Sequence, residues 1–222
     1  MPASTEVNRA PTSSWVLLDL FRAASGTAEL AESAALSNEL RLCDVGRGGT
    51  LFMQDSVHPF VYAVRSGLLK LVYLDEAGDE WIKSFTFEGR YFASIAALVP
   101  GGRASFMVRA IEDSVVERVD YRLLEGLAAR HLDWARALLV LTQQFAARKE
   151  LREKELLTLT AEQRYIAFTE QHPGLVKRIH QKDLALHLGL TPVGLNRIVA
   201  RLRRAAPAPR AQSPGPARPT GA

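Results

Sequence analysis

The sequence predicts an α+β protein in which an antiparallel β domain is followed by a long helix and a small helical domain. Three observations carry this prediction. Short β-type runs separated by glycines fill residues 42–119, which is typical of an antiparallel sandwich or barrel. Residues 131–157 contain no Gly or Pro and predict one long helix. A helix, a short Gly-containing turn and a second helix follow over 181–204.

Composition excludes several classes of protein. The chain has 222 residues, of which 47% are hydrophobic and 23% are charged, so one large or two small domains can each form a core. No apolar run approaches a membrane span, and the polar N-terminus holds no signal-peptide core. The lone cysteine, Cys43, cannot form an internal disulfide or a Cys-rich metal site. We therefore expect a cytoplasmic protein with no metal site and no membrane contact.

Charge is distributed unevenly along the chain. Residues 1–130 hold 13 basic and 17 acidic residues, whereas 131–222 hold 15 basic and 7 acidic. A basic half joined to a weakly acidic half indicates an anionic partner. Because the basic half has no Trp/Phe-rich amphipathic face, this pattern favours nucleic acid over a membrane.

The two ends of the chain are predicted to be disordered tails, over residues 1–14 and 205–222. The second is rich in Ala and Pro and lacks the apolar content that would offset the entropy of ordering. After the N-terminal tail, apolar spacing predicts two helices, at 15–21 and 27–40. The second of these helices has Thr27 as its predicted N-cap. These two helices lead into the β region. The helices and the β region together form a predicted domain over 15–130.

A long helix is predicted over residues 131–158. At 1.5 Å per residue it spans ~40 Å, longer than one small domain buries. Two interpretations remain open: a core helix packed on its own β domain, or a dimerisation helix, which we favour because a self-complementary seam is the commonest route to oligomers. The candidate seam follows a +4, +3, +4 spacing and consists of Trp134, Leu138, Leu141 and Phe145.

The basic unit over 159–204 carries the local signals of a helix-turn-helix. Thr160 and Gln163 have the spacing of a capping box. Further on, Gly189 supplies the turn, and Thr191 with Pro192 supplies an N-cap and a first helical residue.

The spacing of apolar residues divides this unit into a buried and an outward face. Leu184, Ala185, Leu188, Leu195 and Ile198 face inward. The outward residues are rich in Asn and Arg, which bond base edges and phosphates in a major groove. The alternative is an Arg-rich solvated face on a helical hairpin. The predicted DNA contacts are Gln181, Lys182, Thr191, Val193, Asn196, Arg197 and Arg201.

This organisation resembles the CRP/FNR family, the regulators of the cAMP receptor protein and fumarate–nitrate reduction type. The resemblance covers about residues 20–204 and is carried by Val64-Arg65-Ser66-Gly67 and by the stretches 87–94, 100–120 and 159–202. It implies a β-roll sensor domain like a cyclic-nucleotide-binding domain, a dimerisation helix and a winged-helix-like DNA-binding domain. It also implies double-stranded DNA and a second copy of the chain as partners, with RNA polymerase as a further candidate.

The resemblance places a ligand cassette in the β-roll, but this chain departs from the family pattern. Ala93-Ser94 stands where the family has Gly-Glu, so the acid that holds the ribose hydroxyl is absent. An unpaired buried hydroxyl costs about 1–3 kcal/mol, which predicts that cyclic AMP is not the effector. We predict no cofactor: a single cysteine excludes the iron–sulfur variant, and the histidines form no haem cluster. The residues of this degenerate cassette are Phe92, Ser94, Arg103 and Ser105.

The recognition helix departs as well. Pro192 and Val193 stand where the members that read TGTGA-like half-sites carry Arg and Glu, and Arg197 alone is retained. A wing strand after Leu202 is missing from the pattern. An alternative function therefore stays open, in which the β-roll binds a ligand or a protein and the helix-turn-helix has degenerated. Catalysis is not expected, because the Gly-rich run 46–50 lacks the Lys-Ser/Thr of a phosphate-binding loop.

Overall fold

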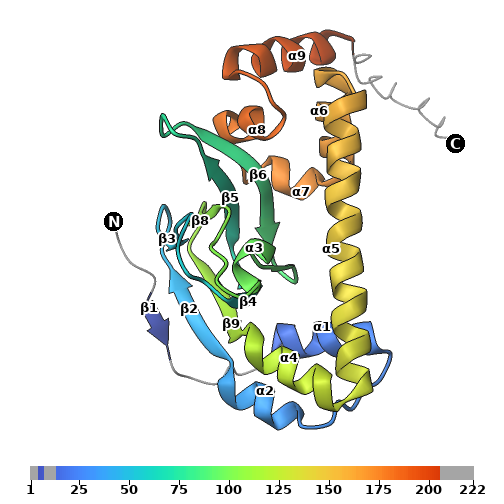
Figure 1. Cartoon of the computed structure of the whole chain (residues 1–222). Helices are drawn as coiled ribbons and strands as arrows, with labels where there is room; N and C mark the ends of the chain where they lie inside the picture. Colours follow the sequence, from blue (N-terminus) through green and yellow to red (C-terminus); the bar gives the residue numbers. More distant parts are fainter. Residues whose placement is uncertain (1–4, 8–13, 206–222) are drawn as a thin grey trace, which may run out of the picture.

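The computed structural model describes residues 5–7 and 14–205. It has three parts along the chain: a β domain, one long helix that runs the full height of the molecule, and a cluster of helices packed on the far end of the β domain (Figure 1). The predicted α+β class is confirmed. No helix that the structure describes is long and apolar enough to cross a membrane.

The β domain is built from two antiparallel sheets that pack as a roll. Their strand orders are β1-β2-β9-β4-β7 and β3-β8-β5-β6. The strands are β1 (Thr5–Val7), β2 (Arg41–Val45), β3 (Thr50–Phe52), β4 (Phe60–Ser66), β5 (Leu68–Leu74), β6 (Glu80–Phe87), β7 (Tyr91–Phe92), β8 (Met107–Ala110) and β9 (Ser114–Asp120).

Strand β1 corrects the prediction of a disordered N-terminal tail at residues 5–7; residues 1–4 and 8–13 of that predicted tail lie outside the described residues. The strand pairs antiparallel with β2, with Glu6 opposite Cys43. The polar composition of this segment gives no sign of a strand, but the edge of β2 offers backbone partners to any extended chain. The predicted C-terminal tail lies outside the described residues, apart from Ala205, which belongs to the last helix.

Nine helices are assigned within the described residues. The second starts later than predicted: Ser33 opens it, after Glu32 in a left-handed conformation with φ 53°. Thr27 is therefore not its N-cap; the Thr27 hydroxyl donates to the Glu29 carbonyl instead. The helices are α1 (Val16–Ser25), α2 (Ser33–Glu39), α3 (Ile95–Leu98), α4 (Tyr121–Arg130), α5 (Leu132–Thr158), α6 (Ala161–Gln171), α7 (Pro173–Val176), α8 (Gln181–His187) and α9 (Pro192–Ala205).

The corner between β4 and β5 requires a glycine. Gly67 has φ +95°, and a Cβ at this position would lie 2.2 Å from the Ser114 Oγ. Any side chain would therefore collide with β9 as well as strain the backbone. This explains the Ser-Gly pair that carries part of the family resemblance.

A buried carboxylate fixes α1 against the sheet. The Glu117 side chain, on β9, is completely buried and accepts hydrogen bonds from the backbone N–H groups of Val16 and Leu17, each at 2.8 Å. The Arg65 guanidinium donates to the same carboxylate. A negative charge at the first turn of a helix satisfies its free N–H groups and complements its dipole.

Three of the four residues of the predicted dimer seam on α5, Trp134, Leu138 and Leu141, pack on the core of the chain's own protomer instead. Trp134 is completely buried, its ring centroid lies 5.1 Å from that of Phe21, and its Nε1 donates to the Ala31 carbonyl at 2.7 Å. Leu141 is also buried, and Leu138 packs against the same core. The other interpretation, a core helix, describes this half of α5. A heptad spacing does not distinguish a seam that meets its own domain from one that meets a second copy.

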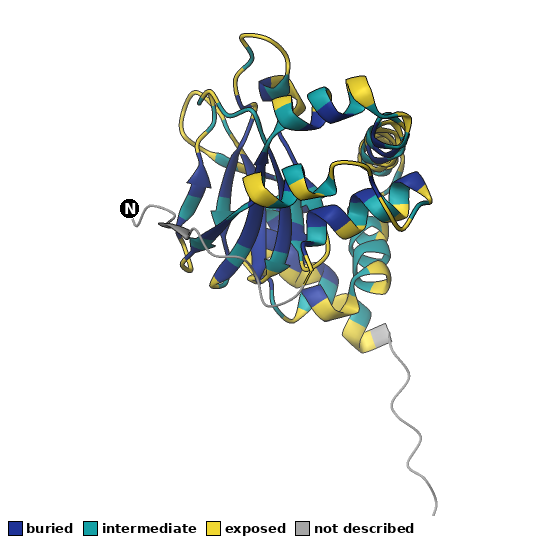
Figure 2. Cartoon of the chain, turned by 90° about the horizontal axis from the view of Figure 1, so that it is seen from below, coloured by how far each residue is buried: buried dark blue, intermediate teal, exposed yellow. Residues whose placement is uncertain are grey.

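The buried side chains of α5 lie in its first half, and the helix becomes more exposed toward its C-terminal end. In Figure 2 the strands at the centre of the β domain are mostly buried, while loops and outer helix faces are exposed. On α5 the buried residues are Trp134, Ala137 and Leu141. Beyond Leu141 the helix has no buried residue, so its second half stands away from the β domain.

Candidate nucleic-acid interface and ligand cassette

Local side-chain bonds define the start of the basic unit as predicted. The Thr160 Oγ1 accepts from the Gln163 N–H, and the Gln163 Oε1 accepts from the Thr160 N–H at 2.8 Å. This confirms the capping box at the start of α6. From α6, the Arg164 guanidinium donates to the Leu159 carbonyl at 2.7 Å and to the Leu188 carbonyl at 3.1 Å. The arginine therefore ties the end of α5 to the helix-turn-helix.

The turn between α8 and α9 also follows the sequence prediction. Gly189 has φ +70°, the left-handed conformation that a tight interhelical turn needs. The Thr191 Oγ1 accepts from the Gly194 N–H at 3.1 Å, which confirms the N-cap, and Pro192 is the first helical residue. Both helix ends are thus fixed by residues that the sequence singled out.

The two helices bury the predicted inward face. Ala185 and Leu195 are completely buried, with Leu188 at 1% and Leu184 at 3% exposure. Ala185 is small where α8 and α9 approach each other, so no larger side chain separates them. The predicted core of the helix-turn-helix is confirmed for these residues.

The predicted DNA contacts all lie on the exposed side of this pair. Val193 is 60% exposed, and the other six are exposed as well. On α9, Val193, Arg197 and Arg201 follow one another at four-residue intervals and share one face. The Arg201 guanidinium pairs with the Glu162 carboxylate of α6, so it has an intramolecular partner. The structure brings α9 and the first turn of α8 together at one end of the molecule (Figure 1).

The one acidic residue of residues 172–204 is turned away from this surface. Asp183 is buried, and its Oδ1 accepts from the Lys70 Nζ of β5 at 3.0 Å. Lys70 also donates to Glu80 at 3.1 Å. With its acid neutralised against the β domain, the outward face of the α8–α9 pair presents only basic and uncharged side chains.

Side chains in α8 and just before it hold the helix-turn-helix on the β domain. The Arg178 guanidinium donates to Glu112 at 2.6 Å and to Glu88 at 2.9 Å, which raises the pKa of this arginine. The His187 Nδ1 lies 3.3 Å from the Ile82 carbonyl of β6. Burial, and then the charge of Arg152, lower the pKa of His187 to about 3. The imidazole is therefore neutral at physiological pH and donates to that carbonyl.

The predicted ligand cassette is only partly assembled. The Ser94 Oγ accepts from the Ser105 N–H at 2.9 Å, so these two residues do come together. Phe92 is buried in the core and stacks on Tyr62 at 5.1 Å. Arg103 is exposed, and its Nη1 donates to the Asp55 carbonyl at 2.7 Å. The hydrogen bond of the one cation of the predicted set is thus to a backbone carbonyl and not to either serine.

Aromatic side chains fill the roll beside the cassette. The His58 ring stacks on Phe52 at 4.2 Å, and its Nε2 is hydrogen-bonded to the Tyr62 hydroxyl. Burial, and then the charge of Arg118, lower the pKa of His58 to about 4. Phe106 continues the stack at 5.7 Å from Phe52. Hydrophobic and neutral groups thus occupy the middle of the roll.

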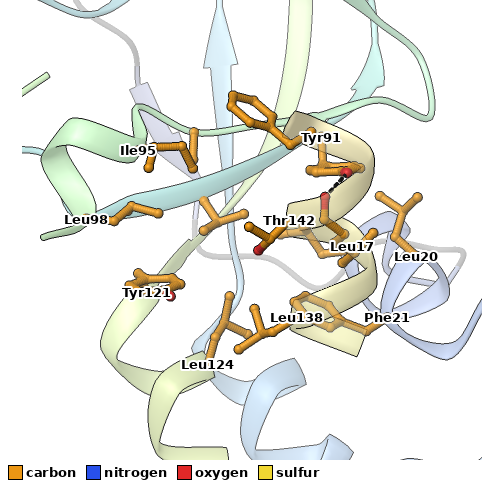
Figure 3. Close-up of a pocket in the computed structure, with 14 residues that line it drawn as sticks. Leu17, Leu20, Phe21, Tyr91, Ile95, Leu98, Tyr121, Leu124, Leu138 and Thr142 are labelled. Carbon is orange, nitrogen blue, oxygen red and sulfur yellow. Dashed lines mark hydrogen bonds between the residues drawn. The ribbon is translucent and has the colours of Figure 1, made fainter. Parts of the chain in front are cut away.

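A small cavity of about 60 Å³ lies on the other side of the cassette, between the β domain and α5 (Figure 3). Its lining is apolar and includes Leu138 and Thr142 of α5. The Tyr91 hydroxyl donates to the Leu141 carbonyl at 2.6 Å across its edge. The cavity has room for only a few water molecules, and it is too small for a nucleotide.

Comparison with known proteins agrees with this architecture. Residues 42–131 match the family model of the cyclic nucleotide-binding domain. The fumarate and nitrate reduction regulatory protein of Salmonella typhi is 25% identical over 174 residues, which cover 72% of this chain and 68% of that protein. Residues 42–131 are therefore similar to cyclic nucleotide-binding domains, and the chain as a whole is similar to a regulator of the CRP/FNR type. This agrees with the prediction of a regulator and not an enzyme.

Solved structures of CRP/FNR-type proteins share the fold. FixK2 from Bradyrhizobium japonicum has a TM-score of 0.65 and 22% identity, covering 74% of this chain and 84% of its own. A CooA variant from Carboxydothermus hydrogenoformans has a TM-score of 0.63 and 15% identity, covering 89% of this chain and 87% of its own. At these levels of sequence identity the similarity shows a shared fold. It says nothing about which ligand this chain binds.

Sequence reasoning missed the contacts that join the β domain to the basic helical unit 159–204. Lys70 and Asp183 are 113 positions apart, and Arg178 and Glu88 are 90 apart. No local spacing relates such residues. A weak signal existed for Asp183 alone, since a single acid within a basic stretch needs a partner if it is buried. No strand occurs in residues 159–205, so the described part of the basic helical unit has no wing.

Proposed function

We propose that this chain regulates transcription by binding double-stranded DNA as a homodimer, with α9 in the major groove. The observation that carries the proposal is the outward face of α9, where Asn196, Arg197 and Arg201 are exposed while the neighbouring acid, Asp183, is buried. Asn and Arg side chains bond base edges and phosphates. RNA polymerase as a further partner and a cytoplasmic location belong to the same proposal, since a regulator of this kind acts at promoters.

A face of α5 opposite the buried seam supports the homodimer. Leu132 is 73% exposed and Leu139 is 58% exposed, and Ala146 follows at the same seven-residue interval, also exposed. This spacing suits two helices that pack along their length. Trp134 lies on the opposite side of the helix and stays in the core of its own protomer.

Sedimentation equilibrium tests the dimer. Leu139→Glu places a charge in the seam and is expected to raise the dissociation constant by at least about tenfold. Gln144→Glu adds the same charge on the same helix outside the seam and is expected to leave the dimer intact. A monomeric wild-type protein, or equal weakening by both substitutions, would contradict this part of the proposal.

Selection from a random library of DNA duplexes tests DNA binding by the full-length protein. We expect enrichment of a two-fold symmetric motif whose half-site centres lie about 10 base pairs apart. Binding should weaken steeply as salt is raised, because phosphate contacts release counterions.

A second candidate function is that the chain binds a partner protein instead of DNA. It stays open because the side chains of Pro192 and Val193 form no hydrogen bonds to bases. A dimer that enriches no duplex but binds a protein partner tightly would favour that role.

We also propose that cyclic AMP is not the effector. Ala93 and Ser94 supply no carboxylate for the ribose, the Ser94 Oγ already accepts from Ser105, and Arg103 bonds the Asp55 carbonyl. Thermal denaturation with millimolar cyclic AMP is expected to show no stabilisation. A ligand at a hundred times its dissociation constant adds about 2.7 kcal/mol, so a rise in the melting temperature of several degrees would refute this point.

A further inference from the structure

The first turn of α9 has an apolar outer surface. Pro192 and Val193 are both exposed, Val193 at 60%. At about 100° per residue, Val193 lies almost directly opposite the face formed by Leu195 and Ile198, which are buried against the rest of the helical unit. Figure 1 shows α9 at one end of the molecule. Val193 therefore lies at the centre of the surface that α9 exposes to a partner.

One stripe of α9 combines this apolar residue with cations. Its four members are exposed and lie within about 60° of arc at about 100° per residue: Val193, Arg197, Ala200 and Arg204. Within residues 5–7 and 14–205, no carboxylate forms an ion pair with Arg197 or Arg204. The stripe spans about 16 Å of helix at 1.5 Å per residue. Its cations suit an anionic partner such as DNA, and its apolar members have to contact something else on that partner.

Hydrogen-bonding groups are scarce in the first turn of α9. Pro192 has no N–H group, and the Gly194 N–H donates to the Thr191 Oγ1 at 3.1 Å. The Val193 side chain contains neither a donor nor an acceptor. In a helix-turn-helix, the N-terminal residues of the second helix contact the edges of the bases. The Val193 side chain can therefore recognise a base only through an apolar group.

The major groove of DNA exposes one apolar group at the base edges, the C5-methyl of thymine. The other groups there are hydrogen-bond donors and acceptors, and covering one of them with a valine side chain costs free energy. Valine is also a poorer helix former than alanine, glutamate or lysine. The stability of α9 therefore does not account for a valine at this exposed position, whereas contact with a methyl group does.

We propose that Val193 determines part of the sequence specificity by contacting the C5-methyl of one thymine in each half-site. This inference rests on the proposed function, because it requires α9 to enter the major groove. Arg197 lies four residues further on, about 6 Å along the helix, which corresponds to about two base pairs of the duplex. Arginine bonds O6 and N7 of guanine. The half-site therefore contains a thymine about two base pairs from a guanine.

Replacement of thymine by deoxyuridine tests the contact, since it removes the methyl group and preserves base pairing. A duplex selected by the full-length protein is prepared with each thymine of the half-site replaced in turn, in both half-sites at once. At one position we expect the affinity to fall about fifteenfold, which is the value of one buried methyl group in each half-site. Val193→Ala should weaken binding to the thymine duplex and distinguish thymine from uracil at that position by less than about twofold.

Val57→Ala is the matched control. It makes the same change at a valine of the β domain that is 68% exposed, and it should keep the full sensitivity to uracil. Equal affinity for thymine and uracil at every position, or a uracil effect that persists undiminished in Val193→Ala, would overturn the role of Val193 and leave DNA binding by α9 in place. A protein that enriches no duplex would overturn the proposed function and this inference together.

Discussion

The two helices of the helix-turn-helix have opposite surroundings. In α8, four of seven residues are buried, Asp183 pairs with Lys70 of the β domain, and His187 bonds the Ile82 carbonyl. In α9, the residues on the outward side are exposed, and Arg201 bonds only Glu162 of the neighbouring helix. The β domain can therefore position the helical unit 159–204 through α8 and through Arg178, which precedes it. Helix α9 remains available to a partner outside the chain.

This difference predicts different consequences of substitution in the two helices. Changes at the α8 contact should alter stability and the placement of the unit on the β domain. Changes on the outer face of α9 should leave stability unchanged and alter only binding. The predictions below test that division, beginning with the largest effect.

Lys70→Met should cause the largest loss of stability. It leaves Asp183 buried without a partner, whereas Glu80 keeps Arg109. Breaking a buried ion pair by removing one member costs about 3–5 kcal/mol, measured as the free energy of unfolding in urea. The double variant Lys70→Met/Asp183→Leu should regain most of that loss, because it removes both charges. A single variant as stable as the wild type would show that the contact with α8 contributes nothing.

His187 should make stability depend on pH. Its pKa is about 3 in the folded protein and 6.5 as the ordinary value, so the unfolded chain binds more protons between these two. The contribution of His187 to the free energy of unfolding is fully present above about pH 6.5. As the pH falls below about 6.5, the free energy of unfolding decreases by about 1.4 kcal/mol per pH unit. His187→Gln keeps a donor for the Ile82 carbonyl and should show a shallower fall between about pH 7 and pH 5.

Two other charged or titratable groups near His187 affect the pH dependence of the free energy of unfolding. Arg152, whose guanidinium donates to the His187 carbonyl, is charged throughout the range. Burial lowers the pKa of His172 as well, so the variant retains some slope of its own. Parallel curves for wild type and His187→Gln would refute the assignment of the pH dependence to His187.

Lys182→Gln should have the smallest effect, on the salt dependence of DNA binding. Lys182 is exposed in the first turn of α8, where a phosphate contact suits a lysine. Loss of one such contact lowers the slope of log K against log salt by about 1 and weakens binding similarly for all sequences. Lys154→Gln is the matched control. An unchanged slope would show that α8 does not reach the DNA backbone.

The sequence predicted best what depends on neighbouring residues. The capping box at Thr160, the turn at Gly189 and the cap at Thr191 involve partners within a few positions, and each has the predicted geometry. The helical spacing over 184–198 also predicted which side chains are buried. Local chemistry is enough to define such elements.

Features that depend on distant residues were predicted less well. The spacing of Trp134 and Leu141 indicated a seam but not its partner, which is the chain's own β domain. The position of Arg103 came from the family resemblance, which did not indicate that its side chain bonds the Asp55 carbonyl. Such contacts follow from tertiary packing, which spacing along the chain does not encode.

The central claim is that α9 reads DNA while α8 holds the unit in place, and one comparison tests it most directly. Equilibrium binding to a selected duplex is measured for the wild type, Arg197→Ala and the control Lys154→Ala, together with the free energy of unfolding of each. Arg197→Ala should lower the affinity by about 1–3 kcal/mol, the value of one base contact, with stability unchanged within about 0.5 kcal/mol. Wild-type affinity in Arg197→Ala would contradict the claim.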